Sequence, residues 1–385
     1  MGTSKPEMVR RLVISGYYGF RNSGDEAVLK SILLALKEQG AAQGADIRPV
    51  VLSADPAWTA EMYGVDAVHR MRPAEVLRAL RASDGLISGG GSLLQDATGA
   101  LTIPYYTGII KLAQLLGKPT FIYSQGIGPV NRRWMDPLIR HVMQRSTYVS
   151  VRDAESAELL GRMGVARDRI DVVPDPVMGL PLPQEAAAAA HAGGAGDAPA
   201  PAGTAAAPVV GVSLRRWRKD GADLARAAEA LAALAHRRAV RLRFLPFHTP
   251  SDAEASKEVM ERLGSLGGGS SVELAAPGDD PQRMLLEVGR CDLLFGMRLH
   301  ALIYAANQEV PMLGLSYDPK IDQFLHRLGL EPVGTTERLD PEAFADQAVA
   351  LLEGGETWRE RHRGAIRTLK AEAVRPAQQI VRLLR

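Results

Sequence analysis

The feature of this sequence that most constrains its fold is a regular alternation of short strand-like and longer helix-like segments, interrupted once. Runs rich in β-branched residues predict strands, and apolar residues at helical spacing predict helices, as in 25–39. The expected strands are Arg11–Ser15, Pro49–Leu52, Gly85–Ser88, Thr120–Tyr123, Tyr148–Val151, Asp171–Val173, Val209–Leu214, Arg241–Leu245, Val272–Leu274, Asp292–Phe295 and Met312–Leu315. Such alternation predicts an α/β protein with parallel sheets covered by helices on both faces.

The interruption at residues 181–208 divides the chain. It is rich in Ala, Gly and Pro and has almost no large apolar side chain. A segment with so little to bury does not offset the entropy of its own ordering, so we predict a flexible linker. We therefore expect one Rossmann-like domain at 8–180, a second at 209–370, and a C-terminal helix at 371–385.

The last segment, 365–385, has the pattern of a basic amphipathic helix. Two interpretations stay open, because such a helix either lies on a membrane surface or packs back across the domains. A narrow apolar face and the helix-breaking Pro376 favour packing.

Composition excludes several classes of protein. Lys and Arg total 46 against 44 Asp and Glu, so the chain has no overall basic field for nucleic acid. A single cysteine, Cys291, excludes an intramolecular disulfide framework and a Cys-rich zinc module. Motif spacings for a metal site, a P-loop or a nucleophile elbow do not occur, and we expect neither a metal nor a cofactor. Without a signal peptide or a long apolar run, we expect a cytoplasmic protein.

In parallel sheets ligands bind beyond the carboxyl ends of the strands, and unusual residues follow four strands of the first domain. The loop 16–26 offers helix N–H groups to an anion, but Asp25 competes with a phosphate there, and a capped helix without a ligand is the equal alternative. Three glycines at 89–91 imply close approach to a ligand or to a neighbouring helix. A small, tight turn follows at 124–129, and Arg152 ends a further strand beside an aspartate.

Two strand ends of the second domain carry concentrated charge. Residues 215–219 place four cations beside an indole. This pattern favours a site for a phosphate or carboxylate over a solvated basic turn. His300 is expected on a first helical turn within reach of Arg298, which suits general acid catalysis. Lys320 follows the next strand and reaches the same rim, and His248 is a second, weaker histidine candidate.

Six motifs occur in a fixed order along the chain. They read Gly-Tyr-Tyr-Gly-Phe-x-Asn-x-Gly-Asp-Glu-Ala, Gly-Gly-Gly-Ser-Leu-Leu-Gln-Asp, Gln-Gly-Ile-Gly-Pro, Val-Arg-Asp, Ser-Leu-Arg-x-Trp and Gly-Met-Arg-Leu-His-Ala-Leu-Ile. Together they resemble the polysaccharide pyruvyl transferase family, most closely its CsaB-type members, over about residues 10–330 outside the linker. The resemblance implies two Rossmann-like domains facing a crevice, in the glycosyltransferase-B-like arrangement.

The resemblance also implies a reaction. Phosphoenolpyruvate would donate its enolpyruvyl group to an N-acetylmannosamine residue of a disaccharide carried on undecaprenyl diphosphate. The product would be a 4,6-linked pyruvate ketal, with phosphate released, on a secondary cell-wall polymer to which S-layer proteins attach. Contact with the inner face of the cell membrane would come through the lipid-linked substrate. The alternatives are a sugar-nucleotide-dependent glycosyltransferase or epimerase, and a non-catalytic glycan-binding module, against which the 5% aromatic content argues.

The resemblance assigns roles residue by residue. The histidine, lysine and arginine of the family match His300, Lys320 and Arg152, which we expect to be catalytic. Arg215 and Arg298 would bind phosphate and carboxylate together with Lys320, and Arg152 would reach across from the first domain. The remaining expected substrate-binding residues, on the acceptor side, are Tyr18, Asn22, Gly24, Asp25, Gly90, Gly91, Ser92, Gln125 and Gly126.

Overall fold

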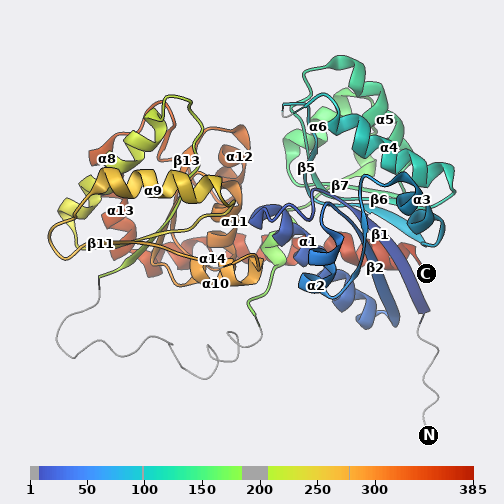
Figure 1. The fold of residues 1–385 in the computed structure, drawn as a ribbon, viewed down its shortest axis with the longest axis horizontal. Helices are drawn as coiled ribbons and strands as arrows, with labels where there is room; N and C mark the ends of the chain where they lie inside the picture. Colours follow the sequence, from blue (N-terminus) through green and yellow to red (C-terminus); the bar gives the residue numbers. More distant parts are fainter. Residues whose placement is uncertain (1–7, 98, 184–206, 277) are drawn as a thin grey trace, which may run out of the picture. The chain divides into compact units, whose positions relative to one another are not determined.

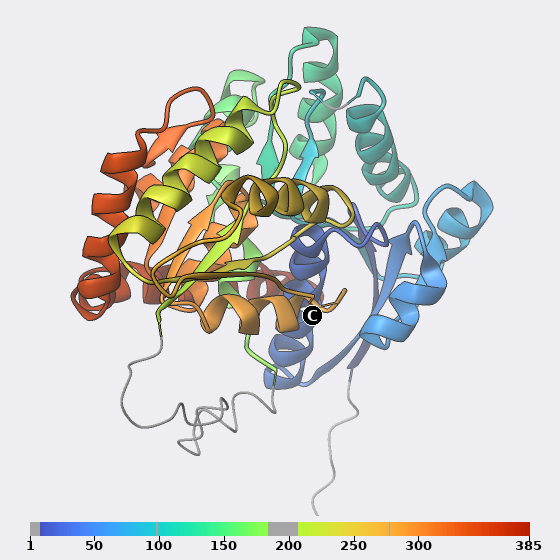
Figure 2. The ribbon, with the colours of Figure 1, turned by 60° about the vertical axis from the view of Figure 1, so that its left-hand side comes forward.

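The computed structural model describes residues 8–97, 99–183, 207–276 and 278–385, so most of the expected linker lies outside the described residues. Each of the two units into which the contacts divide the chain has its own parallel sheet with helices packed against it (Figure 1 and Figure 2).

The first unit comprises Met1–Leu180 together with Leu369–Arg385, and the second comprises Pro181–Thr368. The expected domain at 209–370 thus corresponds to a unit that ends at Thr368. The residues after it belong to the first unit.

The sheet of the first unit has eight strands among the described residues, in the order β3-β2-β1-β4-β6-β7-β8, with β5 beside β6. Every pairing is parallel. The strands are β1 (Met8–Ser15), β2 (Ala45–Ser53), β3 (Asp66–His69), β4 (Gly85–Ser88), β5 (Gly91–Leu94), β6 (Thr120–Ile127), β7 (Tyr148–Val151) and β8 (Ile170–Val172). The central strands are buried throughout, as is typical of a parallel sheet covered on both faces.

Helices follow most of these strands. They are α1 (Ser23–Ala42), α2 (Pro56–Tyr63), α3 (Pro73–Arg81), α4 (Thr102–Leu115), α5 (Asp136–Arg145) and α6 (Ala154–Arg162), with short 3-10 turns η1 (Arg133–Met135), η2 (Arg167–Arg169) and η3 (Pro176–Gly179). Their apolar faces pack on the sheet around residues such as Leu80, Ile110 and Leu160.

The second unit has a six-stranded parallel sheet in the order β11-β10-β9-β12-β13-β14. The strands are β9 (Val209–Ser213), β10 (Arg241–Phe244), β11 (Ser271–Leu274), β12 (Leu293–Gly296), β13 (Met312–Ser316) and β14 (Gly334–Thr335). The helices are α8 (Ala222–Arg237), α9 (Ser251–Leu263), α10 (Pro281–Gly289), α11 (Leu299–Asn307), α12 (Pro319–Arg327), α13 (Pro341–Glu353) and α14 (Gly355–Ala373), of which α14 belongs to this unit only up to Thr368. A core that includes Leu231, Val259 and Phe344 joins α8, α9 and α13 to one face of this sheet.

The C-terminal segment packs on the first unit. The helix breaks after Ala373, next to Pro376, and α15 (Arg375–Leu383) lies against α1 (Figure 1). Its Ile380 is buried, and Arg375 Nη1 lies 3.1 Å from Asp171 Oδ1. No helix among the described residues combines the length and the apolar character needed to cross a membrane.

The α/β fold expected from the alternation is confirmed, and all eleven expected strands coincide with observed ones. Three observed strands were not expected. β3 is an edge strand of only four residues, β5 begins with a glycine, and β14 has two residues. None of these segments is long enough to show a strand periodicity of its own.

Candidate functional site

The first unit brings its unusual loops together because β1, β4, β6 and β7 are neighbours in the sheet. Tyr18, which follows β1, is fully buried, and its ring packs so closely on Gly16 that a Cβ there would lie 2.3 Å from it. A Cβ on Gly89, at the end of β4, would lie 2.1 Å from Tyr18 Oη. The first of the three glycines therefore makes room for a tyrosine of the same unit.

The other two glycines lie against helix α1. A Cβ on Gly90 would lie 2.8 Å from Val28 Cγ1, and one on Gly91 would lie 3.1 Å from Asp25 Oδ1. Gly91 also has φ +90°, a conformation that disfavours any side chain. Of the two explanations offered by the sequence, close approach to a neighbouring helix accounts for Gly90.

Two polar residues shape the loop before α1. Asn22 is the N-cap, and its side-chain oxygen accepts a hydrogen bond of 3.2 Å from the Gly24 N–H. Glu26 is buried and accepts hydrogen bonds from the Gly19 N–H at 2.9 Å and from Tyr63 Oη at 2.8 Å. Burial raises the pKa of Glu26, although these hydrogen bonds oppose the shift. Asn22 and Glu26 therefore fix the loop geometry.

Several buried polar atoms at these strand ends have no hydrogen-bond partner among the described residues. Gln125 Nε2 donates to Ser88 Oγ at 2.7 Å, but Gln125 Oε1 is unpaired, as is Tyr18 Oη. Burial, with the nearby Asp25 charge, raises the pKa of Tyr18 well above its usual value. Unpaired polar atoms in a native interior call for an explanation, and a bound polar molecule supplies one. This strand edge is thus a candidate ligand site.

Arg152 lies at the end of β7 in a network of its own unit. Its side chain is 7% exposed, and it lies 3.5 Å from carboxylate oxygens of both Asp153 and Asp175. Its Nη2 donates to Ser92 Oγ at 2.9 Å, and a Cβ on Gly126 would lie 2.7 Å from its Nε. Two carboxylates balance this guanidinium within the first unit.

In the second unit, the remaining predicted site residues follow four adjacent strands. β10, β9, β12 and β13 are neighbours, and Ser213 of β9 is level with Gly296 of β12. The loops after these strands hold His248, Arg215 and Arg298, and the first helical turns that follow hold His300 and Lys320. The residues predicted for the second domain therefore gather at one edge of one sheet.

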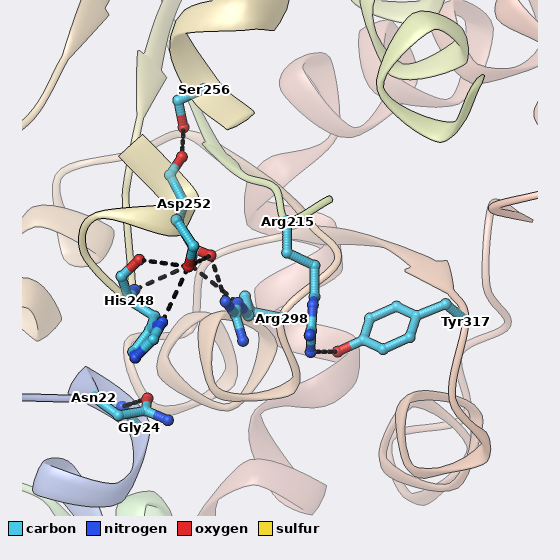
Figure 3. A network of polar contacts seen from close by, with 9 residues as sticks. Asn22, Gly24, Arg215, His248, Asp252, Ser256, Arg298 and Tyr317 are labelled. Carbon is cyan, nitrogen blue, oxygen red and sulfur yellow. Dashed lines mark hydrogen bonds and ion pairs between the residues drawn. The ribbon is translucent and has the colours of Figure 1, made fainter. Parts of the chain in front are cut away.

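Arg215 is held by aromatic side chains. Its Nη1 donates to Tyr317 Oη at 3.1 Å (Figure 3). Its guanidinium carbon lies 5.3 Å from the Trp217 ring centroid and 5.2 Å from that of Tyr317. Its Nε is buried and unpaired. Among the described residues no carboxylate pairs with Arg215, so its charge stays available to an anion.

The rest of the basic run differs from Arg215. Arg216 pairs with Glu258, and Arg218 Nη2 lies 3.0 Å from Asp220 Oδ2. The buried Asp223 accepts hydrogen bonds from the N–H groups of residues 217 and 218, which holds the turn. Arg216 and Arg218 are therefore neutralised by carboxylates, whereas Arg215 is not.

Arg298 is anchored by a residue that the sequence did not single out. Asp252, fully buried at the start of α9, binds Arg298 through both of its oxygens, with Nε 2.9 Å from Oδ2 (Figure 3). The same carboxylate accepts a hydrogen bond of 3.0 Å from the His248 N–H. Burial lowers the pKa of His248, and the charge of Arg298 lowers it further. His248 is therefore held beside Arg298 as a neutral imidazole at neutral pH.

His300 and Lys320 occupy equivalent positions on two helices. Each is the second residue of its helix, α11 or α12, and each side chain is half-buried. Asp318 caps α12 and accepts a hydrogen bond of 3.0 Å from the Lys320 N–H. Both side chains thus begin in first turns directly beyond the sheet edge.

The other reactive groups do not assemble elsewhere in the described residues. Burial raises the pKa of the Cys291 thiol to about 12, which leaves it without thiolate character. The described part of the chain contains no group of three or more His, Cys, Asp or Glu side chains arranged to hold a metal ion.

Asp252, Tyr317 and Asp175 are the polar residues that sequence reasoning missed. Each follows a predicted strand, at 241–245, 312–315 or 171–173, and that position was the available signal. Their pairing with an arginine up to 102 residues away has no local signature.

Comparison with solved structures identifies the fold. UDP-GlcNAc 2-epimerase from Methanocaldococcus jannaschii matches with a TM-score of 0.63 at 12% identity, over 98% of this chain and 99% of that one. UDP-GlcNAc 2-epimerase from Neisseria meningitidis, bound to UDP-GlcNAc, matches with 0.61 at 12% identity, over 98% and 99%. A glycosyltransferase from Rickettsia africae matches with 0.62 at 12% identity, over 99% of both chains. At this identity the likeness confirms the glycosyltransferase-B-like fold and carries no substrate with it.

Comparison with protein families gives a more specific result. The sequence model described as polysaccharide pyruvyl transferase matches residues 22–319. No curated protein matches the sequence.

Proposed function

This chain belongs to the polysaccharide pyruvyl transferase family, and on that premise we propose that it forms a pyruvate ketal on a glycan, with phosphoenolpyruvate as the donor. The observation that carries the proposal is the gathering of Arg215, Arg298, His300 and Lys320 at one edge of the second sheet. Phosphoenolpyruvate carries a phosphate and a carboxylate, and paired cations recognise both groups.

Arg215 is the proposed principal anion ligand. Arginine has five N–H donors, of which Tyr317 engages one, so a bidentate contact with phosphate or carboxylate remains open. Trp217 and Tyr317 fix the plane of the guanidinium, which lowers the entropy lost on binding. Arg298 contributes less net charge because Asp252 neutralises it, and Lys320 adds a point charge.

The proposed chemistry is an addition followed by an elimination and a ring closure. A general acid protonates the methylene carbon C3 of phosphoenolpyruvate while one sugar hydroxyl adds to C2 and loses its proton. The C2–O bond to phosphate then breaks, and the second hydroxyl adds to C2 with loss of its proton. The sum of the steps is one ketal and one inorganic phosphate.

His300 is our proposed general acid, and Lys320 stabilises the departing phosphate. Arg152 takes a different part in this proposal. Because two carboxylates balance its charge, we assign it to positioning Ser92 and Asp175 in the first unit. The expectation that Arg152 also contacts phosphoenolpyruvate stays a prediction.

The acceptor is the finer part of the proposal. We propose that the first unit holds it, with the loops around Tyr18, Asp25 and Gln125. The unpaired oxygens of Tyr18 and Gln125 suit sugar hydroxyls and amides. The acceptor we favour is the diphosphate-linked N-acetylmannosaminyl disaccharide of secondary cell-wall polymer synthesis. Such a substrate would bring the enzyme to the inner face of the cell membrane.

The test is phosphate release from phosphoenolpyruvate with and without a soluble disaccharide-diphosphate acceptor. We expect acceptor-dependent release that falls at least about 100-fold in His300→Ala, the range of general acid contributions. His326→Ala is the matched control, because His326 lies on α12, is exposed and pairs with Glu331.

Release that persists in His300→Ala and falls in His248→Ala would move the acid to His248. Absence of release with an authenticated acceptor would refute the proposed reaction. A uridine diphosphate sugar that raises the melting temperature where phosphoenolpyruvate does not would then favour the glycosyltransferase or epimerase alternative.

A further inference from the structure

The loop after β1 presents a stacked pair of aromatic rings at the protein surface. The rings of Tyr17 and Phe20 are 4.0 Å apart between centroids and 8° from parallel. Tyr17 is 39% exposed and Phe20 is 38% exposed. Single exposed apolar residues are common on protein surfaces and need no explanation. Two rings stacked face to face instead form an ordered aromatic surface.

Arg70, in the loop after β3, supports this pair from its other side. Its guanidinium carbon lies 5.4 Å from the Phe20 ring centroid and 4.5 Å from that of Tyr105 in α4. Its Nη1 donates to the Gly16 carbonyl at 3.2 Å, and among the described residues it has no carboxylate partner. We call Tyr17, Phe20, Arg70 and Tyr105 the aromatic stack.

The backbone has a positive φ angle on both sides of Phe20. Gly19 has φ +79°, and a Cβ there would lie 2.1 Å from Ser53 Oγ. Arg21 has φ +56°, an uncommon conformation for a residue with a side chain, and its guanidinium lies 5.4 Å from the Trp58 ring centroid. The close packing of Gly19 against Ser53 and the cation–π contact of Arg21 hold this loop, so the two rings are oriented before any ligand binds.

A carboxylate stands next to the stack. Asp25 is half-buried in the first turn of α1, which begins directly after the loop that carries both rings, and its Oδ1 lies 3.1 Å from where a Cβ of Gly91 would be. Its charge adds to burial, the main cause, in raising the pKa of Tyr17. A flat aromatic face beside a carboxylate suits a pyranose ring, whose C–H face packs on the aromatic ring while its hydroxyls donate to the carboxylate. The same carboxylate disfavours a phosphate at this place.

We propose that Tyr17 and Phe20, supported by Arg70, form a platform that binds one pyranose ring of a glycan, with Asp25 accepting hydrogen bonds from its hydroxyls. This inference rests on the proposed function in one respect, since it identifies the glycan as the acceptor. The sequence gives no sign of the stack because its members come from two loops and one helix, the loop after β1, the loop after β3 and α4.

The test measures binding without turnover. Saturation-transfer NMR with the methyl glycoside of N-acetylmannosamine, in the absence of phosphoenolpyruvate, gives the Kd of each full-length variant. Tyr17→Ala is expected to raise this Kd about tenfold, which corresponds to about 1.4 kcal/mol, and Tyr17→Phe, which keeps the ring, to stay near wild type. Trp134→Ala is the control, because Trp134 is 60% exposed in the same unit but outside the stack.

The proposal is overturned if the wild type does not bind the glycoside, if Tyr17→Ala binds as the wild type does, or if uridine monophosphate competes for the platform. The two proposals fail separately. Binding that depends on Tyr17 without phosphate release would refute the proposed reaction alone. Acceptor-dependent release with an unchanged acceptor KM in Tyr17→Ala would refute the platform alone.

Discussion

The charge of Arg215 gives the sharpest quantitative prediction. Replacing it with glutamine removes a cation that, unlike Arg216 and Arg218 of the same run, has no carboxylate partner among the described residues. A hydrogen bond to a charged group contributes about 1.5–3 kcal/mol, and a bidentate contact contains two. Because the side chain is only half-buried, we take a combined loss of about 3 kcal/mol, which is about 100-fold in Kd.

Calorimetric titration of phosphoenolpyruvate measures this change directly, without an acceptor. The structure also predicts what should not change. No ion pair within the described residues depends on Arg215, so the melting temperature of Arg215→Gln should stay close to that of the wild type. A large loss of affinity with little loss of stability is the expected signature of a ligand-binding arginine.

Arg216→Gln is the matched control because Arg216 is the next residue, is exposed and is already paired with Glu258. Its Kd for phosphoenolpyruvate should stay within about twofold of wild type. Equal losses in both variants would mean that only the overall charge of the run matters. Wild-type affinity in Arg215→Gln would refute the assignment of this residue.

Two further predictions concern stability. Asp252→Asn should destabilise the second unit by about 2–3 kcal/mol, because it leaves Arg298 without its counter-charge, and thermal melting should show a loss of about 5–10 °C. Glu26→Gln should be more stable than wild type at pH 8 and should lose that advantage by pH 4, because burial raises the pKa of Glu26 and its stabilising protonated form is lost as pH rises.

Each prediction has a control on the surface. Asp220→Asn breaks an exposed pair with Arg218 and should leave the melting temperature nearly unchanged, so an equal loss there would contradict the argument from burial. Glu61→Gln, exposed on α2, should show no pH-dependent difference from wild type in denaturant midpoint. A Glu26→Gln curve parallel to wild type from pH 4 to 8 would contradict the linkage argument.

The fold could be predicted from the sequence because strands and helices show their periodicity within a few neighbouring residues. The predicted strand Thr120–Tyr123 is a short β-branched and aromatic run. The position of a loop directly after a strand places that loop at the edge of the sheet without further information. This rule is sufficient to bring Arg298, His300 and Lys320 into one region.

The sequence could not show which of several similar residues is paired within the protein and which is available to a ligand. Arg215 and Arg216 are adjacent and chemically identical, and only their partners distinguish them. Those partners, Tyr317 and Glu258, lie 102 and 42 residues away along the chain. Likewise, nothing local shows that Gly90 faces Val28 of a helix. Contacts between residues so far apart along the chain leave no periodic pattern in the sequence, so they could not be predicted from it.

The placement of α15 has a consequence for biosynthesis. The chain leaves the first unit at Leu180 and returns to it at Leu369, so the ribosome makes the whole second unit before the helix that covers α1 exists. Until then, the apolar surface that Ala377, Ile380 and Val381 later cover is exposed to water in the nascent first unit. A recombinant first unit would accordingly need residues 369–385 joined to it, and a chain cut before them would leave that surface open to aggregation.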